Sequence, residues 1–339
     1  MLSRSPMRSR CLDIVIPAFN AEAVLGATAD RILAQVLPAG WQYTIIVVDD
    51  GSVDNTAVVV QAMSQDRVRL VRLESNRGRS GALNAGIAAG TGDYVLICDA
   101  DCCYTDRNCL AKFIAGFQAG ADVVIGSITA KGEDFWSCYL VRIQSMRERR
   151  AGKRGILSFT TANIGLRRSV LERIGGFNAA YRHYGFEDRE LLFQVSHHRF
   201  ETLVDPTLKV NHEAKPSLTS LALKMRECGR YSSTILAKRF PSAYRSLPYY
   251  WLDIRSYGSV LARLWFVFPP LVSLAVLAGE PLLRSRWLPF ALKAALVKTV
   301  CGLAYLHGTC LAVRSEGLAQ SDEPAACRAP ANDRDPKAR

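Results

Sequence analysis

The sequence contains ten cysteines but no Cys-x-x-Cys pair. Such pairs build many zinc sites and thiol redox motifs, so their absence argues against both classes. Four cysteines do gather near an acidic group, but their spacing fits no familiar set of zinc ligands; they are Cys98, Cys102, Cys103 and Cys109. Reduced thiols in a cytosolic compartment are the simpler interpretation, with a zinc site as the minor alternative.

A leader peptide and a nucleic-acid motif are missing too. Residues 1–11 form a basic segment, but no apolar stretch follows it, so we expect no signal peptide and a catalytic part that stays in the cytosol. The formal net charge is +12, which favours an anionic partner. Because no recognition motif accompanies this charge, an acidic membrane surface or a phosphorylated substrate is favoured over nucleic acid.

What the sequence does contain is an alternation of strand-like and helix-like segments over residues 12–126. Strands are predicted at 12–17, 43–48, 68–73, 93–98 and 122–126. Helices are predicted at 22–37, 54–64, 80–89 and 106–119. This repetition predicts an α/β fold, in which a mostly parallel, Rossmann-like sheet is covered by helices on both faces.

Two acidic clusters follow two of these strands. The first is Asp49-Asp50-Gly51-Ser52-Val53-Asp54, and the second is Asp99-Ala100-Asp101. The carboxyl ends of strands are where open α/β sheets bind ligands, and paired carboxylates repel each other unless a cation or donor groups satisfy them. A divalent ion with a nucleotide diphosphate would satisfy both clusters. The structural alternative for Asp49 and Asp54 is turn and helix-cap chemistry around Gly51.

The pattern changes after residue 126. Residues 127–160 carry a strong excess of arginine and lysine, which indicates either a solvated helix face or a mobile basic segment near a phosphate-bearing ligand. Residues 161–212 return to short strands and two helices, and residues 216–240 have the spacing of one amphipathic helix. We divide this part of the chain from the next at residue 245.

Residues 246–317 are predicted to form a hydrophobic helical region that associates with a membrane. Two apolar stretches, Val260–Leu283 and Trp287–Val313, approach the roughly 20 residues of a membrane-spanning helix. Pro269-Pro270 would kink the first. If both stretches spanned, Arg284 and Arg286 would lie on the far side, against the positive-inside tendency. A shallow hairpin or helices lying in the interface would avoid this conflict, and spanning is left open. The alternative is an apolar helical subdomain, and residues 318–339 are predicted to be disordered.

Six motifs occur in a recognisable order between residues 12 and 240. They are Pro17-Ala18-Phe19-Asn20-Ala21-Glu22, the two acidic clusters, Asn76-Arg77-Gly78-Arg79-Ser80-Gly81-Ala82-Leu83-Asn84-Ala85-Gly86, Gly175-Gly176-Phe177 and Gly185-Phe186-Glu187-Asp188. In this order they resemble family 2 glycosyltransferases of the GT-A fold. Any one motif is weak, but six in sequence make coincidence improbable.

The resemblance implies a site for a nucleotide-diphospho-sugar, with a UDP-linked sugar preferred, in the half formed by residues 12–126. The donor-binding residues it implies are Pro17, Phe19, Asn20, Glu22, Asp50, Gly78, Arg79, Gly81, Asn84, Asp99, Ala100 and Asn163. Gly78 and Gly81 would allow close approach of a ligand, and Arg79 would meet a phosphate. Tight turns that need glycine are the structural alternative.

The resemblance also implies a metal ion and a general base. Mn²⁺ or Mg²⁺ would be held by Asp101, Asp99 and His212, although a histidine that is merely packed is an equal alternative for His212. Asp188 would take the proton from an acceptor hydroxyl, which gives a single displacement and inversion. Glu187 would assist Asp188 or only cap the helix. Residues 127–245 thus form the acceptor-binding and catalytic half.

One motif of the family is absent, namely the Gln-x-x-Arg-Trp of processive synthases. The corresponding region reads Arg226-Glu227-Cys228-Gly229-Arg230-Tyr231, which favours one transfer per encounter. We therefore expect a non-processive glycosyltransferase acting at the cytoplasmic face of a membrane on a glycan or lipid-linked acceptor. The alternatives are a polyprenyl-phosphate glycosyltransferase and a catalytically silent scaffold that binds sugar nucleotide. The motifs specify neither the sugar nor the oligomeric state.

Overall fold

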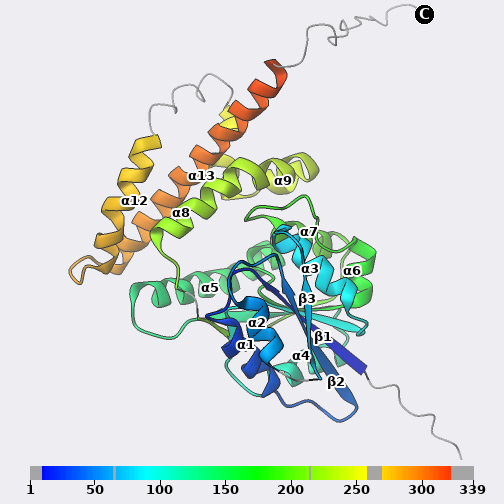
Figure 1. Ribbon diagram of the computed structural model, residues 1–339. Coiled ribbons are helices and arrows are strands. Elements are labelled where there is room, and N and C mark those ends of the chain that lie inside the picture. Colours follow the sequence, from blue (N-terminus) through cyan, green and yellow to red (C-terminus); the bar gives the residue numbers. More distant parts are fainter. Residues whose placement is uncertain (1–9, 64–65, 214, 258–268, 322–339) are drawn as a thin grey trace, which may run out of the picture.

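The centre of the molecule is one eight-stranded sheet with the strand order β3-β2-β1-β4-β7-β6-β8-β5 (Figure 1). The computed structural model describes residues 10–63, 66–213, 215–257 and 269–321. The strands are β1 Arg10–Ala18, β2 Trp41–Asp49, β3 Val68–Arg72, β4 Tyr94–Cys98, β5 Cys102–Tyr104, β6 Val123–Thr129, β7 Asn163–Arg167 and β8 Thr202–His212. The five predicted strands are confirmed as β1, β2, β3, β4 and β6.

The sheet is mixed but mostly parallel. Strands β1 to β4 pair with one another in parallel, and β6 is parallel to β8. Strand β7 is antiparallel to both β4 and β6, and the short β5 is antiparallel to β8. The predicted fold class is therefore confirmed. As a consequence, the acidic ends of β2 and β4 lie at the same edge of the sheet.

Helices cover both faces of the sheet because its central strands are apolar on both sides. Leu12, Ile14 and Ile16 of β1 belong to a core formed with α1 and α4, whereas Val15 belongs to a second core formed with α3, α6 and α7. The helices of this part are α1 Leu25–Leu33, α2 Thr56–Ala62, α3 Gly78–Ala89, α4 Cys109–Gln118, α5 Phe135–Arg154, α6 Arg168–Ile174 and α7 Glu187–His197.

Three features of this half differ from the sequence-based expectations. Helix α1 is shorter than the predicted 22–37, and strand β5 was not predicted. The basic segment contains a helix, α5, whose N-cap Asp134 accepts hydrogen bonds from the amides of Trp136 and Ser137. The helical interpretation of that segment is thus confirmed for residues 135–154.

The C-terminal part is a layer of helices beside the sheet (Figure 1). Its elements are α8 Leu218–Glu227, the π-helical turn η2 Cys228–Ser232, α9 Ser233–Arg239, α10 Pro241–Arg245, the 3₁₀ turns η3 Pro248–Leu252 and η4 Ile254–Tyr257, α12 Pro269–Arg284 and α13 Phe290–Ser321. The predicted helix at 216–240 is thus a helical run interrupted by a π turn. Pro269 and Pro270 begin α12, and the kink predicted at them depends on residues 260–268, which lie outside the described residues.

Helix α13 packs tightly on α8 and η2. A Cβ atom added to Gly308 would lie 2.1 Å from the carbonyl oxygen of Arg226, and one added to Gly229 would lie 2.2 Å from that of Tyr305. The stretch Phe290–Val313 is long and apolar enough to cross a membrane, yet 44% of its most apolar window is buried inside the protein. One side of this helix therefore belongs to the protein core.

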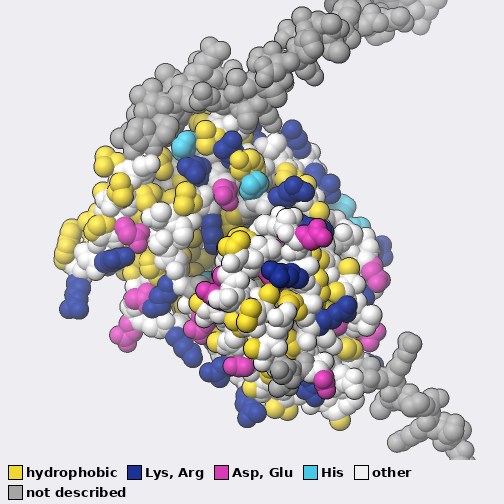
Figure 2. Space-filling model, viewed as in Figure 1, with side chains coloured by type: hydrophobic (Ala, Val, Ile, Leu, Met, Phe, Trp, Pro, Cys, Tyr) yellow, Lys and Arg dark blue, Asp and Glu magenta, His cyan; other side chains and the backbone are white. Residues whose placement is uncertain are grey.

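The C-terminal layer leaves apolar side chains in solvent (Figure 2). Leu274 and Leu277 of α12 are 61% and 72% exposed, and Trp287 in the turn before α13 is 74% exposed. Residues 260–268 of the first predicted apolar stretch lie outside the described residues, as does the predicted tail from residue 322. Residues 318–321, which we expected to be disordered, are instead the end of α13.

Candidate active site

The first acidic cluster closes the loop after β2. Asp49 is fully buried, and its Oδ1 accepts a hydrogen bond from the Ser52 amide at 2.9 Å, so its role is turn chemistry. Oδ1 of Asp50 accepts one from the Arg77 amide at 2.7 Å. Burial raises the pKa of Asp50, and the hydrogen bonds from the amides of Arg77 and Gly78 oppose that rise. Asp50 thus ties the end of β2 to the start of α3.

The loop after β1 is hydrogen-bonded to the loop after β2. Oδ1 of Asn20 accepts from the Val53 amide at 3.0 Å, and Oε2 of Glu22 accepts from the Asn55 amide at 2.9 Å. Asn20 and Glu22 therefore hold the two loops together, and this geometry does not support the donor contacts expected for them. In contrast, the side chain of Phe19 is 50% exposed at this edge, beside the partly buried Pro17, as a platform for a base requires.

The glycines of α3 serve the packing of the chain itself. Gly78 has φ +76°, and a Cβ there would lie 2.6 Å from the carbonyl oxygen of Arg182. A Cβ at Gly81 would lie 2.6 Å from the Cβ of Arg77. The alternative of a sterically required glycine is therefore supported at both positions, and close approach of a ligand to them stays a prediction.

Two side chains that were predicted to contact the sugar-nucleotide donor form hydrogen bonds with the backbone. The amide of Asn84 donates to the carbonyl of Phe177 at 2.7 Å and accepts from its N–H at 2.9 Å. Asn163 is 1% exposed and donates to the carbonyls of Ser127 and Leu208, which joins β7 to β6 and β8. The carboxamide of Asn84 is therefore held by the backbone, whereas Oδ1 of Asn163 has no hydrogen-bond partner among the described residues. The donor contacts of both side chains stay predictions.

Arg79 lies at the centre of the site. Its guanidinium donates to Asp99 Oδ1 at 2.8 Å and to Asp188 Oδ1 at 2.8 Å, and it lies 3.9 Å from Glu187 Oε1. It also donates to the hydroxyl of Thr161 at 3.0 Å. The expected phosphate ligand is therefore a carboxylate clamp, which joins the acidic end of β4 to the start of α7.

The two acids of the last motif differ in their surroundings. Asp188 Oδ1 accepts hydrogen bonds from Arg79 and from the hydroxyl of Thr161. Oε2 of Glu187 is buried and has no hydrogen-bond partner among the described residues. Burial, and then the neighbouring charge of Asp188, raise the pKa of Glu187 to about 7. The pair thus contains one hydrogen-bonded carboxylate and one that is poorly stabilised when charged.

The backbone before this pair is strained. Phe186 has φ +72°, which is rare for a bulky residue. Its ring packs against those of Tyr244, Tyr249 and Tyr305, with centroid distances of 6.0, 5.3 and 6.4 Å. Tyr305 belongs to α13, so the C-terminal helices fix the start of the helix that carries Asp188.

Asp101 and His212 form the part of the site suited to a metal ion. Strand β5 pairs Cys102 with His212, and this places His212 Nε2 at 3.4 Å from Asp101 Oδ2. Burial raises the pKa of Asp101, and the proximity of His212 opposes that rise. A carboxylate with an imidazole is a donor set that suits Mn²⁺. Within the described residues no three His, Cys, Asp or Glu side chains form a metal-binding group, and the expected third ligand, Asp99, faces Arg79.

The remaining residues of this corner are structural. The carbonyl of Ala100 accepts from the hydroxyl of Thr28 at 2.8 Å. Burial raises the pKa of each clustered cysteine, which keeps the thiols protonated and disfavours zinc; they are Cys98, Cys102, Cys103 and Cys109. The minor alternative of a zinc site therefore finds no support.

Thr161 is a site residue that the sequence analysis did not identify. It is fully buried and donates to Asp188 from the loop before β7. The antiparallel register that pairs Cys98 of β4 with Asn163 of β7 brings this loop beside Asp99. Knowledge of that register would have found Thr161, but the residue types alone do not specify it.

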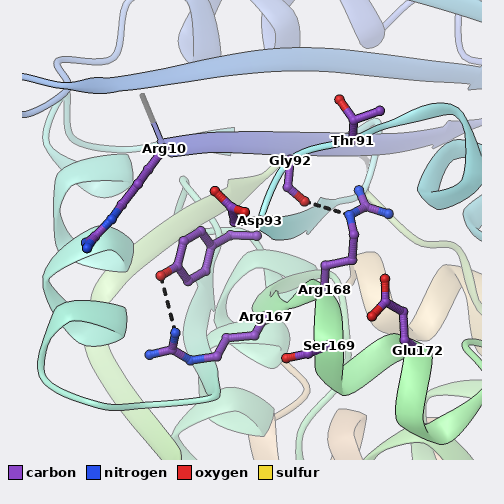
Figure 3. A pocket seen from close by; sticks show the side chains of 9 residues that line it. Arg10, Thr91, Gly92, Asp93, Arg167, Arg168, Ser169 and Glu172 are labelled. Atoms are coloured by element: carbon purple, nitrogen blue, oxygen red, sulfur yellow. Dashed lines mark hydrogen bonds between the residues drawn. The ribbon is translucent and has the colours of Figure 1, made fainter. Parts of the chain in front are cut away.

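A hollow of about 710 Å³ lies at the opposite end of the sheet, near the start of β1 and β4 (Figure 3). Two arginines that line this hollow form hydrogen bonds with other groups of the protein. Arg168 donates to the carbonyls of Gly92 and Ile87 and to Asp13, and Arg167 donates to the hydroxyl of Tyr94. Because no acidic motif lies there, we place the candidate site at the other edge.

Residues 13–175 match the family described as Glycosyl transferase family 2. The chain carries a family 2 glycosyltransferase domain. A mannosyltransferase from Pyrobaculum calidifontis, solved with GDP-Man and Mn²⁺, has the same fold, with a TM-score of 0.56, 19% identity and coverage of 87% of this chain and 86% of that one.

Curated relatives match this domain over part of their length. The human dolichyl-phosphate beta-glucosyltransferase is 37% identical over 26% of this chain and 31% of its own length. An undecaprenyl-phosphate 4-deoxy-4-formamido-L-arabinose transferase from Pseudomonas aeruginosa is 31% identical over 48% of each chain. The succinoglycan biosynthesis protein ExoO of Rhizobium meliloti is 28% identical over 47% of each. This chain thus spans from a third to a half of these relatives.

Proposed function

We propose that this protein is an inverting, metal-dependent glycosyltransferase that moves a sugar from a nucleotide-diphospho-sugar, UDP-linked in our preferred version, to an acceptor at a membrane surface. The observation that carries the proposal is the clamp of Arg79 on Asp99 and Asp188. It joins the two acidic motifs that the family resemblance assigns to the donor and to the base. The family 2 match of residues 13–175 supports the same interpretation.

The donor would lie across the acidic ends of β2 and β4. Phe19 and Pro17 offer an apolar surface to a base, and Asp50 and Asp99 offer acceptors to a base or ribose. Asp101 and His212 would hold Mn²⁺ or Mg²⁺. The mannosyltransferase of the same fold was solved in complex with Mn²⁺. When bound, such an ion neutralises the charge of a departing diphosphate.

Asp188 would act as the general base towards an acceptor hydroxyl. Arg79 and Thr161 both donate to its Oδ1, which fixes the rotamer of the carboxylate and leaves Oδ2 to accept a proton. One base and one leaving group imply direct displacement, hence inversion, and no carboxylate nucleophile is needed.

A second candidate is transfer to a polyprenyl phosphate. The names of the human and Pseudomonas relatives, which describe lipid-phosphate transferases, favour it. A phosphate oxygen is already ionised near neutral pH and needs little help from a base. The two candidates therefore differ in their need for Asp188. The exposed apolar side chains of α12 favour action at the cytoplasmic face of a membrane in either case.

The test is release of nucleotide diphosphate by the full chain in the presence of Mn²⁺, with a panel of nucleotide sugars and with hydroxyl and phosphate acceptors. We expect Asp188→Asn to lower turnover onto a hydroxyl by about 100-fold or more. Unchanged turnover in this variant would show that Asp188 is not the general base. Nucleotide binding without turnover by the wild type would instead favour the silent scaffold.

A further inference from the structure

A pair of arginines without counter-ions lies beside the proposed base. Arg189 directly follows Asp188 in the first turn of α7, and its Nη1 donates to the carbonyl of Leu157 at 2.8 Å. Arg147 lies in α5, and its carbonyl accepts from the Ser158 hydroxyl at 3.2 Å. Both arginines thus flank the same short 3₁₀ turn, η1 Gly155–Ser158, which follows α5 in the chain and packs against α7.

The positive charge of this pair is only partly compensated by the protein, because the charge of Asp188 opposes the lowering of the Arg147 pKa without forming an ion pair with Arg147. In the part of the chain that the structure describes, neither Arg147 nor Arg189 forms an ion pair with a carboxylate, although both are partly buried. Other partly buried arginines are paired: Arg79 with Asp188 at 2.8 Å and Arg168 with Asp13 at 2.6 Å. Burial, and then the charge of Arg189, lower the pKa of Arg147. Two cations in this position cost free energy unless an anion joins them.

Two tyrosines complete the surroundings of the pair. The guanidinium carbon of Arg189 lies 5.8 Å from the centre of the Tyr249 ring. Tyr184, which is 46% exposed, and Tyr249 both contribute to the electrostatic environment of Arg147. A phenol hydroxyl is protonated near neutral pH and can donate a hydrogen bond. The two arginines and the two tyrosines are thus groups that can donate to an anion.

We propose that Arg147 and Arg189 bind a phosphate group carried by the acceptor substrate. A guanidinium presents a planar fork of donors that matches phosphate oxygens, and a phosphomonoester brings the negative charge that the pair lacks. The position next to Asp188 assigns this phosphate to the acceptor, because the donor diphosphate belongs at Asp101 and His212. This inference rests on the proposed function, because the acceptor side of the site is located by the proposed role of Asp188 as the general base.

The test is binding of farnesyl phosphate, farnesol and glucose 1-phosphate to the full chain, measured by titration calorimetry in detergent. We expect the wild type to bind farnesyl phosphate and not farnesol. Arg147→Gln and Arg189→Gln should each weaken binding by about 10- to 100-fold, the value of a lost hydrogen bond to a charged group. Arg150→Gln, an exposed arginine of the same helix, is the matched control and should bind as the wild type does.

The other outcomes are equally decisive. Equal binding of glucose 1-phosphate would support the phosphate site and make its source a soluble ester, whereas binding of farnesyl phosphate alone would make it a lipid. Binding that is equal in the Arg147→Gln and Arg150→Gln variants would overturn the inference. Arg189→Lys keeps the charge and should lose less affinity than Arg189→Gln, which separates recognition from misfolding.

Thermal stabilisation by UDP with Mn²⁺ separates this inference from the proposed function. We expect that stabilisation to be unchanged in Arg147→Gln. If it were lost there while farnesyl phosphate still bound, the pair would belong to the donor and the inference would fall. A different result would contradict only the proposed function. In that case neither UDP nor another nucleotide diphosphate would stabilise the wild type in the presence of Mn²⁺, while farnesyl phosphate would still bind through the arginine pair.

Discussion

At the scale of single residues, one guanidinium organises the site. Arg79 is positioned by the first turn of α3 and reaches Asp99 on one side and Asp188 on the other. The two carboxylates and the nearby Glu187 would repel one another without it. An arginine suits this position because its planar fork donates in several directions at once and its charge is permanent.

Replacing Arg79 should therefore disable the site. We expect Arg79→Ala to lower turnover at least 100-fold and to reduce the thermal midpoint, because removal of one partner leaves the partly buried carboxylates unpaired. Arg79→Lys should recover little, since one ammonium cannot replace the fork. Arg173→Ala is the matched control: this exposed arginine of α6 forms no ion pair among the described residues, so its loss should be nearly neutral. An active Arg79→Ala variant would contradict the clamp.

Glu187 should make stability depend on pH. Its pKa is about 7 in the folded protein against 4.5 when exposed, so between these values the folded state binds more protons. Its contribution is present below pH 4.5 and is lost as the pH rises through about 7, at a cost on the order of 3 kcal/mol. Glu187→Gln removes this dependence.

The measurement is the thermal midpoint of both proteins from pH 5 to pH 8. The advantage of Glu187→Gln over the wild type should grow as the pH rises, whereas the exposed Glu201→Gln should follow the wild type throughout. A difference that stays constant or shrinks across this range would show that Glu187 does not carry the raised pKa.

At the scale of elements, the sequence predicted what depends on apolar runs and acidic strand ends. The five strands of residues 12–126 and the α/β class follow from such runs, and the grouping of Asp99 with Asp188 follows from the motifs. Strand β5 could not be predicted, because its three residues form a strand only through pairing with β8. The backbone contacts of Asn84 and Asn163 could not be predicted for a similar reason, since their amides bond to backbone that is distant in sequence.

The helix packing in the C-terminal layer could not be predicted from the sequence either. The π turn at Cys228–Ser232 and the glycines of α13 make a contact that neither segment specifies alone. A glycine within an apolar helix is ordinarily a weak point of about 1 kcal/mol relative to alanine. At Gly308 it is instead a requirement for backbone contact.

Gly308→Ala should therefore destabilise the protein, although alanine favours helix. Its Cβ would lie 2.1 Å from the Arg226 carbonyl oxygen, and the forced separation should cost about 1–3 kcal/mol by denaturant unfolding. Gly302→Ala on the same helix is the control: its nearest neighbour would be at 3.6 Å, so it should be neutral or stabilising. A stabilised Gly308→Ala variant would show that α13 does not pack this closely.

At the scale of the whole molecule, the C-terminal helices have two sides with different tasks. One side supports the catalytic loop, because Tyr305 packs on Phe186 next to Glu187 and Asp188. The other side exposes leucines and Trp287 (Figure 2). This division favours a helical layer that rests on a membrane and holds the active site at its surface.

Membrane attachment should depend on the exposed leucines. We expect the double variant Leu274→Ser and Leu277→Ser to lose binding to anionic lipid vesicles in a flotation assay, because both side chains are more than 60% exposed on α12. Leu203→Ser, which is 40% exposed on β8, is the control and should float as the wild type does. Equal flotation of all three proteins would place the membrane contact elsewhere.

The central claim is that Asp101 and His212 hold a divalent ion together with a nucleotide diphosphate. Electron paramagnetic resonance of Mn²⁺, titrated with the protein in the presence and absence of UDP, measures this directly. We predict that UDP increases the affinity for Mn²⁺ in the wild type and that Asp101→Asn abolishes the increase. If both proteins bound Mn²⁺ equally, with no effect of UDP, the account of the site would be contradicted.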